Sequence, residues 1–271
     1  MASIWNPSPK GLETVTWNAD AGSPSPGPRI STLLQTIESH ITADIIFLQE
    51  VNEAALVQLL AHPWVQQNWY SNEADTSHFR HQALTTVTLI SKSSSVKLGQ
   101  VWRVNLPSPF ERDGLCCDVF AKNASQKENS RVRLVNVHLD SLHTIPLLRM
   151  QQVWIVTQFM RSAGCGVVAG DFDPLFQEDE KVLQINGLVD SWASFRQWDP
   201  GYTWGLSEEE QLLFSSRLGK VVVYSLAAAN IDMLPVSSIQ HGDTALDFSQ
   251  HHGICCFIAW QRYLTPLGQQ D

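Results

Sequence analysis

The spacing of hydrophobic residues along the chain predicts short strands interleaved with amphipathic helices. Between residues 29 and 41 the apolar positions recur at every third or fourth residue, which is typical of a helix with one buried face. Short β-branched runs bounded by polar residues are typical of strands. These patterns predict strands at 13–17, 45–48, 84–90, 115–120, 131–138, 166–169, 219–225 and 253–260, and helices at 29–41, 52–60 and 146–160. Such interleaving indicates an α/β fold.

The segments between these elements carry turn-forming or polar residues. Prolines and glycines in 19–28 predict a loop, and 193–217 is predicted to be mostly loop. No internal repeat or linker interrupts the pattern. We therefore expect one domain over 13–262, with flexible termini at 1–12 and 263–271.

Composition and charge limit the classes of function. Hydrophobic residues make up 44% of the 271 positions and charged residues 17%, which favours a folded core over global disorder. The net charge of −9 argues against a protein that coats nucleic acid, because phosphate neutralisation normally requires a basic surface. An enzyme that holds Mg²⁺ could still act on phosphodiesters, since the metal supplies positive charge locally.

Nothing in the sequence predicts a membrane segment. No apolar run approaches the roughly 18 residues of a membrane-spanning helix, and the first ten residues lack the apolar centre of a signal peptide. We expect an intracellular protein, nuclear or cytoplasmic. The odd number of five cysteines and the absence of a Cys-x-x-Cys pair favour reduced thiols over disulfides or a zinc site.

Polar side chains follow several predicted strands at the point where each strand ends. Asn18, Glu50, His138 and Asp171 occupy these positions. Strand ends that meet at one edge of a sheet commonly form the active site of an α/β fold. Carboxylate and amide oxygens are the ligands that Mg²⁺ prefers, so this edge could hold the ion.

The order of short motifs along the chain is more specific than any one of them. The motifs are Thr16-Trp17-Asn18, Leu48-Gln49-Glu50, Asn136-Val137-His138-Leu139-Asp140, Gly170-Asp171-Phe172-Asp173, Gly201-Tyr202-Thr203-Trp204, Arg217-Leu218-Gly219 and Ser249-Gln250-His251. This series resembles the endonuclease/exonuclease/phosphatase family. The resemblance implies a DNase I-like fold, which is a four-layer α/β sandwich of two mixed β-sheets packed face to face with helices outside.

Some of these motifs are most similar to the branch of the family that removes tyrosine from DNA 5′ ends. They are Trp17-Asn18, His138-Leu139-Asp140-Ser141, Asp190-Ser191-Trp192, Gly201-Tyr202-Thr203-Trp204 and the segment Glu111-Arg112-Asp113-Gly114. The branch resemblance implies a phosphodiester substrate such as a blocked DNA 5′ end, a role in DNA repair, and substrate contacts from Arg112 and Trp204. We expect a monomer with no membrane partner.

The family resemblance also implies a role for each matched residue. Glu50 matches the carboxylate that binds Mg²⁺ (or Mn²⁺), with Asn18 beside it as a further ligand and catalytic residue. Asp171 matches the residue that orients or deprotonates the attacking water. His251 and His138 match histidines that contact the phosphate as negative charge builds.

Three matched positions depart from the family pattern. Asp173 replaces an asparagine in the catalytic motif, Gly219 replaces an aspartate, and Gln250 replaces the aspartate before the late histidine. The two lost carboxylates would otherwise assist the metal and hold the histidine, and loss of such support commonly lowers activity about 10–100-fold. Asp173 would repel a phosphate unless it were metal-bound or protonated. Asp232, Asp243 and Asp247 are candidates to compensate.

Two functions remain open on these grounds. The first is a Mg²⁺-dependent phosphodiesterase or nuclease of reduced activity. The second is a pseudoenzyme that retains the fold as a binding or scaffold module. Members of the family that act on RNA tails or on sphingomyelin share the same core motifs, so the sequence leaves the substrate undetermined.

Overall fold

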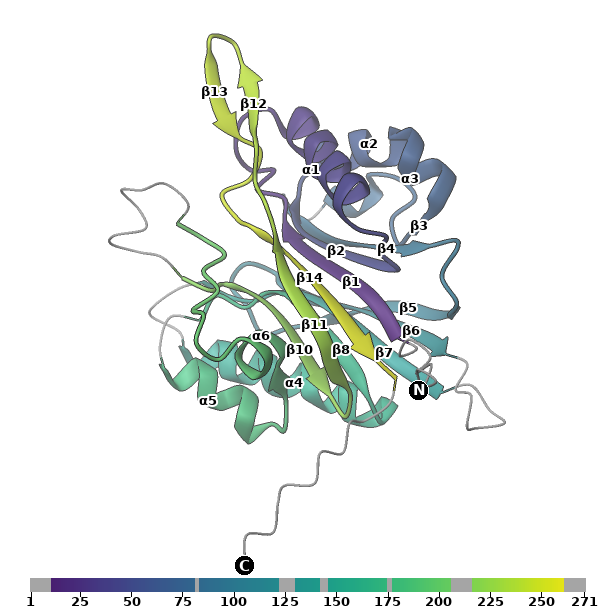
Figure 1. The fold of residues 1–271 in the computed structure, drawn as a ribbon, viewed down its shortest axis with the longest axis vertical. Helices are drawn as coiled ribbons and strands as arrows, with labels where there is room; N and C mark the ends of the chain where they lie inside the picture. Colours follow the sequence, from purple (N-terminus) through teal and green to yellow (C-terminus); the bar gives the residue numbers. More distant parts are fainter. Residues whose placement is uncertain are drawn as a thin grey trace, which may run out of the picture.

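The computed structural model describes residues 11–80, 83–121, 130–141, 146–174, 177–205 and 216–260. Within these ranges, two six-stranded sheets pack face to face, and helices cover their outer faces (Figure 1). This arrangement confirms the predicted fold class. None of the helices in these ranges is long and apolar enough to cross a membrane.

The first sheet gathers strands from both ends of the chain. Its order is β11 (Ala227–Leu234), β14 (Gly253–Ala259), β1 (Gly11–Asn18), β2 (Ile45–Val51), β4 (Thr85–Ser91) and β3 (Trp69–Ser71). The central pair β1 and β2 is parallel, and the other neighbours are antiparallel.

The second sheet comes from the middle of the chain. Its order is β5 (Lys97–Asn105), β6 (Asp113–Ala121), β7 (Ser130–His138), β8 (Gly166–Asp171), β10 (Gly219–Tyr224) and β9 (Val189–Asp190). Again the central pair, β7 and β8, is parallel, and the remaining neighbours are antiparallel. The two sheets therefore repeat one pairing pattern.

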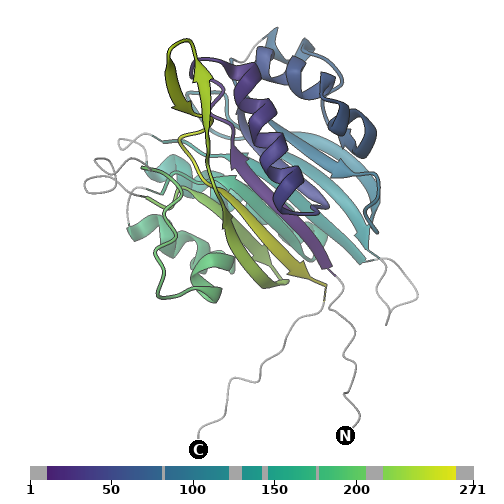
Figure 2. The ribbon, with the colours of Figure 1, turned by 45° about the horizontal axis from the view of Figure 1, so that its top comes forward.

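Helices cover the outer face of each sheet, as Figure 2 shows for α1. The first sheet carries α1 (Pro26–His40), α2 (Glu53–Ala61) and α3 (Pro63–Asn68), with a 3₁₀ turn at Ser77–Arg80, and the second carries α4 (Pro146–Ala163), α5 (Gln177–Ile185) and α6 (Ser191–Phe195). A third apolar cluster, which includes Phe47, Leu134 and Ile254, lies between the sheets. Burial on both faces explains why the central strands are almost continuously apolar.

The sequence prediction missed the strands β3, β9 and β11, the helices α3, α5 and α6, and three largely exposed strands. Edge strand β5 is largely exposed, so it lacks the alternation that would have predicted it. A two-stranded hairpin, β12 (Ser238–His241) and β13 (Thr244–Asp247), projects from the body of the molecule (Figure 1) and was also not predicted. Residues 11 and 12, expected in the flexible leader, instead begin β1 and pair with β14. The other terminal residues, 1–10 and 261–271, lie outside the described ranges.

All five cysteines are free thiols, as the sequence predicts. Cys116, Cys117 and Cys256 are buried, and burial raises the pKa of the Cys116 thiol to about 12. These thiols therefore stay protonated in the core and serve as small apolar side chains.

The two parallel pairs place four strand ends at one edge of the sandwich. Asn18 ends β1 next to Gln49 of β2, and His138 ends β7 opposite Asp171 of β8. The face-to-face packing of the sheets then brings these ends together, which is the arrangement that the sequence predicts.

Candidate active site

Asn18 connects the two carboxylates that the sequence places on different strands. Its amide nitrogen donates to Glu50 Oε1 at 3.1 Å and to Asp171 Oδ2 at 2.9 Å. Glu50 belongs to the first sheet and Asp171 to the second, so this contact joins the sheets at the predicted site.

The orientation of the Asn18 amide is fixed by a third hydrogen bond. Its oxygen accepts from the backbone N–H of Asp20 at 2.9 Å, and a flipped amide would place two donors against each other there. The side-chain oxygen therefore faces away from Glu50 and Asp171. The nitrogen of Asn18 is thus the atom that meets the carboxylates, and a role of Asn18 as a metal ligand stays a prediction.

A bulge in β2 turns Glu50 toward the site. The pairing of β2 with β4 shifts register between Leu48 and Val51, and Glu50 adopts a φ of 52° inside this shift. Positive φ is uncommon for a residue with a side chain, and such strain is often found at functional sites. Val51 points into the core, so the bulge allows Glu50 to leave the strand while its neighbours stay packed.

Asn136 supports this bulge from the opposite sheet. Its amide nitrogen donates to the carbonyls of Leu48 at 3.1 Å and Val87 at 3.0 Å, and its oxygen accepts from Gln49 at 2.8 Å. Asn136 is fully buried, so these bonds have no competition from water. Sequence reasoning assigned no role to Asn136, although a buried asparagine inside an apolar strand is the signal that could have found it.

Gly170 allows the neighbouring strands to approach closely before Asp171. Its φ is 144°, and a Cβ at this position would lie 1.9 Å from the carbonyl oxygen of Val137. Only glycine fits such a conformation and spacing. The glycine of the Gly-Asp motif is therefore required to place Asp171 beside His138.

His251 is held over Asp171 by its backbone. Its carbonyl accepts a hydrogen bond from the Trp17 indole at 2.7 Å, and its N–H donates to Ser249 Oγ at 3.0 Å. His251 Nδ1 then lies 3.6 Å from Asp171 Oδ2. The next residue, His252, instead directs its Nδ1 to the carbonyl of Leu234 at 3.3 Å.

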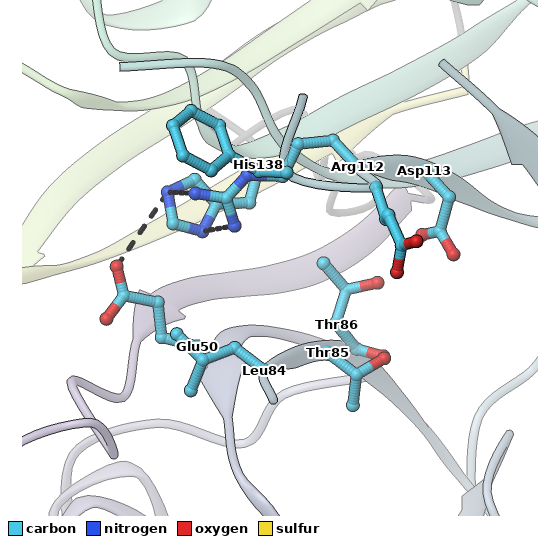
Figure 3. Close-up of a pocket in the computed structure, with 9 residues that line it drawn as sticks. Glu50, Leu84, Thr85, Thr86, Arg112, Asp113 and His138 are labelled. Carbon is cyan, nitrogen blue, oxygen red and sulfur yellow. Dashed lines mark hydrogen bonds and ion pairs between the residues drawn. The ribbon is translucent and has the colours of Figure 1, made fainter. Parts of the chain in front are cut away.

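Arg112 lies against the ring of His138, as Figure 3 shows. One guanidinium nitrogen is 3.0 Å from Nδ1 and the other is 3.3 Å from Nε2. A neutral imidazole has only one acceptor nitrogen, so both contacts together indicate stacking rather than two ordinary hydrogen bonds. Burial, followed by the positive charge of Arg112, lowers the pKa of His138 to about 4. His138 is therefore neutral near pH 7.

Asp173 is a buried carboxylate at the centre of the site. It has a φ of 44°, and its Oδ2 lies 3.3 Å from His138 Nε2. This oxygen accepts no hydrogen bond from any residue that the structure describes. Burial raises the pKa of Asp173 to about 6. An asparagine here would donate to a phosphate, whereas Asp173 favours a cation.

The donor set fits a divalent cation. Glu50, Asp171 and Asp173 offer carboxylate oxygens, and the oxygen of Asp173 without a hydrogen bond is an available ligand atom. Hard divalent cations such as Mg²⁺ and Mn²⁺ bind such oxygens. Glu50 would hold the ion, and the hydrogen bond from Asn18 would keep the Glu50 carboxylate in place.

An open pocket with about 310 Å³ of empty space begins at Glu50 and His138. Arg112 lines one side, and Leu84, Thr85 and Thr86 line the other (Figure 3). Phe110 also belongs to the lining. The other predicted substrate residue, Trp204, pairs through its backbone with His251. Both predicted substrate contacts thus lie next to predicted catalytic residues.

The three departures from the family pattern fall at or next to this site. Gly219 pairs with Asp171 across β8 and β10, and it lines a small pocket together with Asn18, Asp171 and His251. Gln250 is exposed. The carboxylates at these positions are therefore absent from the site.

None of the three predicted compensating residues is paired within the site. Asp232 pairs with Arg196, and Asp247 accepts from Ser238 in the projecting hairpin. Asp243 is exposed at the turn of the same hairpin. The prediction that they could replace the lost carboxylates is wrong for this arrangement.

Solved structures with known folds resemble the chain over nearly its whole length. D. rerio TDP2 complexed with a single-stranded DNA product matches with a TM-score of 0.73 at 20% identity, covering 92% of this chain and 99% of that chain. An endonuclease/exonuclease/phosphatase family protein from Bacteroides thetaiotaomicron matches with a TM-score of 0.71 at 14% identity, covering 93% and 99%. The human Nocturnin catalytic domain matches with a TM-score of 0.62 at 14% identity, covering 93% of each chain.

No protein-family model and no curated protein sequence matches the chain. The structural matches nevertheless agree with the motif order and with the topology of two mixed sheets. The chain therefore has the fold of the endonuclease/exonuclease/phosphatase proteins, with TDP2 structures among those it resembles.

Proposed function

We propose that the protein is a divalent-metal-dependent phosphodiesterase that acts on blocked nucleic-acid ends, such as 5′-tyrosyl DNA. The observation that carries the proposal is the contact of Asn18 with both Glu50 and Asp171, since it unites a candidate metal ligand with a candidate base. The resemblance to TDP2 with a single-stranded DNA product supports this substrate class.

The bound cation would neutralise charge on the phosphate and favour attack on phosphorus. Asp171 accepts a proton from water, and the water oxygen forms a bond to phosphorus. The bond from phosphorus to the leaving oxygen breaks at the same time, and the leaving group takes up a proton from solvent or a nearby acid. The Asn18 amide holds Asp171 at 2.9 Å, which keeps its carboxylate in place for this transfer.

Two basic side chains are candidates to contact the phosphate. His251 lies 3.6 Å from Asp171 and can donate to a phosphate oxygen as charge develops. Arg112 lines the pocket and carries a guanidinium group, whereas His138 in the same lining is neutral. Arg112 is therefore the stronger candidate for phosphate binding, and His138 positions it by stacking.

The test compares hydrolysis by the wild type and Asp171→Asn over a substrate panel with added Mg²⁺ or Mn²⁺. The panel contains a 5′-tyrosyl oligonucleotide, a nitrophenyl phosphodiester and a phosphomonoester. We expect loss of about 10²–10⁴-fold in kcat/KM for Asp171→Asn, which is typical for removal of a general base. Asp243→Asn in the exposed hairpin serves as the matched control and should match the wild type. Equal rates for wild type and Asp171→Asn would remove Asp171 from the mechanism.

A second candidate function is a pseudoenzyme that binds nucleic-acid ends or a protein without turnover. The exposed Gln250 and the space beside Gly219 favour it, because both carboxylates that would assist the centre are absent. Activity that appears only after these carboxylates are restored would distinguish the pseudoenzyme from the weak enzyme.

A further inference from the structure

His138, Asp171 and Asp173 form a compact group of metal-ligating side chains. One ligand atom from each lies within 4.8 Å of the other two, and all three residues are buried. Glu50 is not a member of this group, although its Oε1 lies 3.8 Å from His138 Nε2. The group therefore offers a second donor set beside the carboxylate that the motif pattern assigns to Mg²⁺.

Asp173 Oδ2 gives independent support for a bound ligand. The side chain is 9% exposed, and Oδ2 accepts no hydrogen bond from any described residue. A buried carboxylate oxygen without a partner is costly, so a native protein usually satisfies it with a donor or a cation. His138 Nε2 lies 3.3 Å from this oxygen and belongs to the same group of ligands.

The other contacts leave the required ligand atoms accessible. Asp171 Oδ2 meets Asn18 and His251, while Oδ1 accepts only a long hydrogen bond, from the Asp173 N–H at 3.4 Å, among the bonds of the described residues and keeps a second lone pair. Arg112 stacks on the face of the His138 ring, so the lone pair in the plane of the ring remains directed away from the guanidinium. One oxygen of Asp171 and one nitrogen of His138 are therefore available together.

Local charge also favours a cation. The carboxylates of Glu50, Asp171 and Asp173 outnumber the positive charge of Arg112 beside them. A divalent ion would offset this excess of negative charge at short range.

We propose that His138, Asp171 and Asp173 form a transition-metal site, distinct from the Glu50 position, that prefers Mn²⁺ or Co²⁺ to Mg²⁺. The imidazole nitrogen provides the preference, because Mg²⁺ strongly favours oxygen ligands whereas first-row transition metals accept mixed nitrogen and oxygen sets. Replacement of the usual asparagine by Asp173 creates this ligand set. The inference concerns binding alone and does not require turnover.

The test is a titration of the full-length, metal-free protein with Co²⁺, followed by visible absorption, and with Mn²⁺ or Mg²⁺, followed by calorimetry. We expect tighter binding of Mn²⁺ than of Mg²⁺, and a cobalt spectrum that depends on His138. Asp173→Asn and His138→Gln should each lower Mn²⁺ affinity at least about 10-fold, since even the loss of a partner to a metal ligand costs 10–100-fold.

Two further variants separate this site from the Glu50 position and from general damage. Glu50→Gln should lower Co²⁺ affinity by less than the loss of about 10-fold or more expected for a ligand, because Glu50 contributes nearby charge but no ligand atom. Asp243→Asn should leave it unchanged. Circular dichroism checks that every variant is folded.

Three outcomes would overturn the inference: no Co²⁺ or Mn²⁺ binding by the wild type, unchanged affinity in folded Asp173→Asn, or an equal loss in Glu50→Gln. Metal binding at these three residues without hydrolysis would support this inference and contradict the proposed function. Mg²⁺-dependent hydrolysis without Mn²⁺ binding at these residues would support the proposed function and contradict this inference.

Discussion

Gly219 begins β10 directly opposite Asp171, where an added carboxylate could enter the site. A Cβ at this position would lie 3.5 Å from Thr203 Oγ1 and 3.7 Å from Ile254, which are ordinary contacts. Gly219→Asp should therefore fold, and together with Gln250→Asp it should raise kcat/KM on a phosphodiester by about 10-fold or more.

The matched control for this gain is Gly219→Asn with Gln250→Asn, which adds similar volume without charge. Steady-state kinetics at saturating Mg²⁺ would measure both pairs. Equal rates for the aspartate and asparagine pairs would show that charge at these positions does not limit the reaction.

Sequence reasoning at single residues succeeded where an apolar run ends in a polar side chain. Asn18, His138 and Asp171 lie at such ends, so their meeting at one edge could be predicted from parallel strand pairing. The stacking of Arg112 on His138 could not, because it depends on the register that pairs Gly114 with Val137. The orientation of the Asn18 amide likewise depends on a backbone N–H in the following loop.

At the scale of elements, prediction followed burial. Strands between helices and the opposite sheet carry continuous apolar runs, whereas β5 and the β12–β13 hairpin have exposed faces that give no clear pattern. The bulge that turns Glu50 toward the site could not be predicted from the sequence either, because it arises from the pairing of β2 with β4.

Glu13 gives strand β1 a pH dependence. Partial burial, followed by the negative charge of Asp44, raises the pKa of Glu13 from its ordinary value of 4.5 to about 7. The folded state thus favours the protonated form, so this contribution to stability is present below about pH 4.5 and is lost as the pH rises through 7.

The Glu13→Gln variant has no carboxyl group to ionise at this position. The difference between its free energy of unfolding and that of the wild type should therefore be larger at pH 8 than at pH 5. The expected rise is about 1 kcal/mol, reduced for solvent screening because Glu13 is partly exposed. Urea denaturation at the two pH values measures it, with the exposed Glu38→Gln as control. The same difference at both pH values would contradict the prediction.

At the scale of the whole molecule, the net charge of −9 makes recognition of a long nucleic-acid backbone unfavourable. Positive charge is instead local to the site. Arg112 lines the pocket, and the nearby carboxylates fit a metal ion. This distribution favours a small or end-specific substrate. The sequence predicted the charge, but the fold alone places Arg112 beside those carboxylates.

The central claim is that Glu50 and Asp171, contributed by different sheets, act as one hydrolytic centre through Asn18. A double-mutant cycle on kcat/KM with Glu50→Gln and Asp171→Asn tests it most directly. If each single variant loses about 10²-fold, the account predicts that the double variant loses little more, because residues that act as a unit are not additive. A double variant whose loss approaches the product, about 10⁴-fold, would contradict the account.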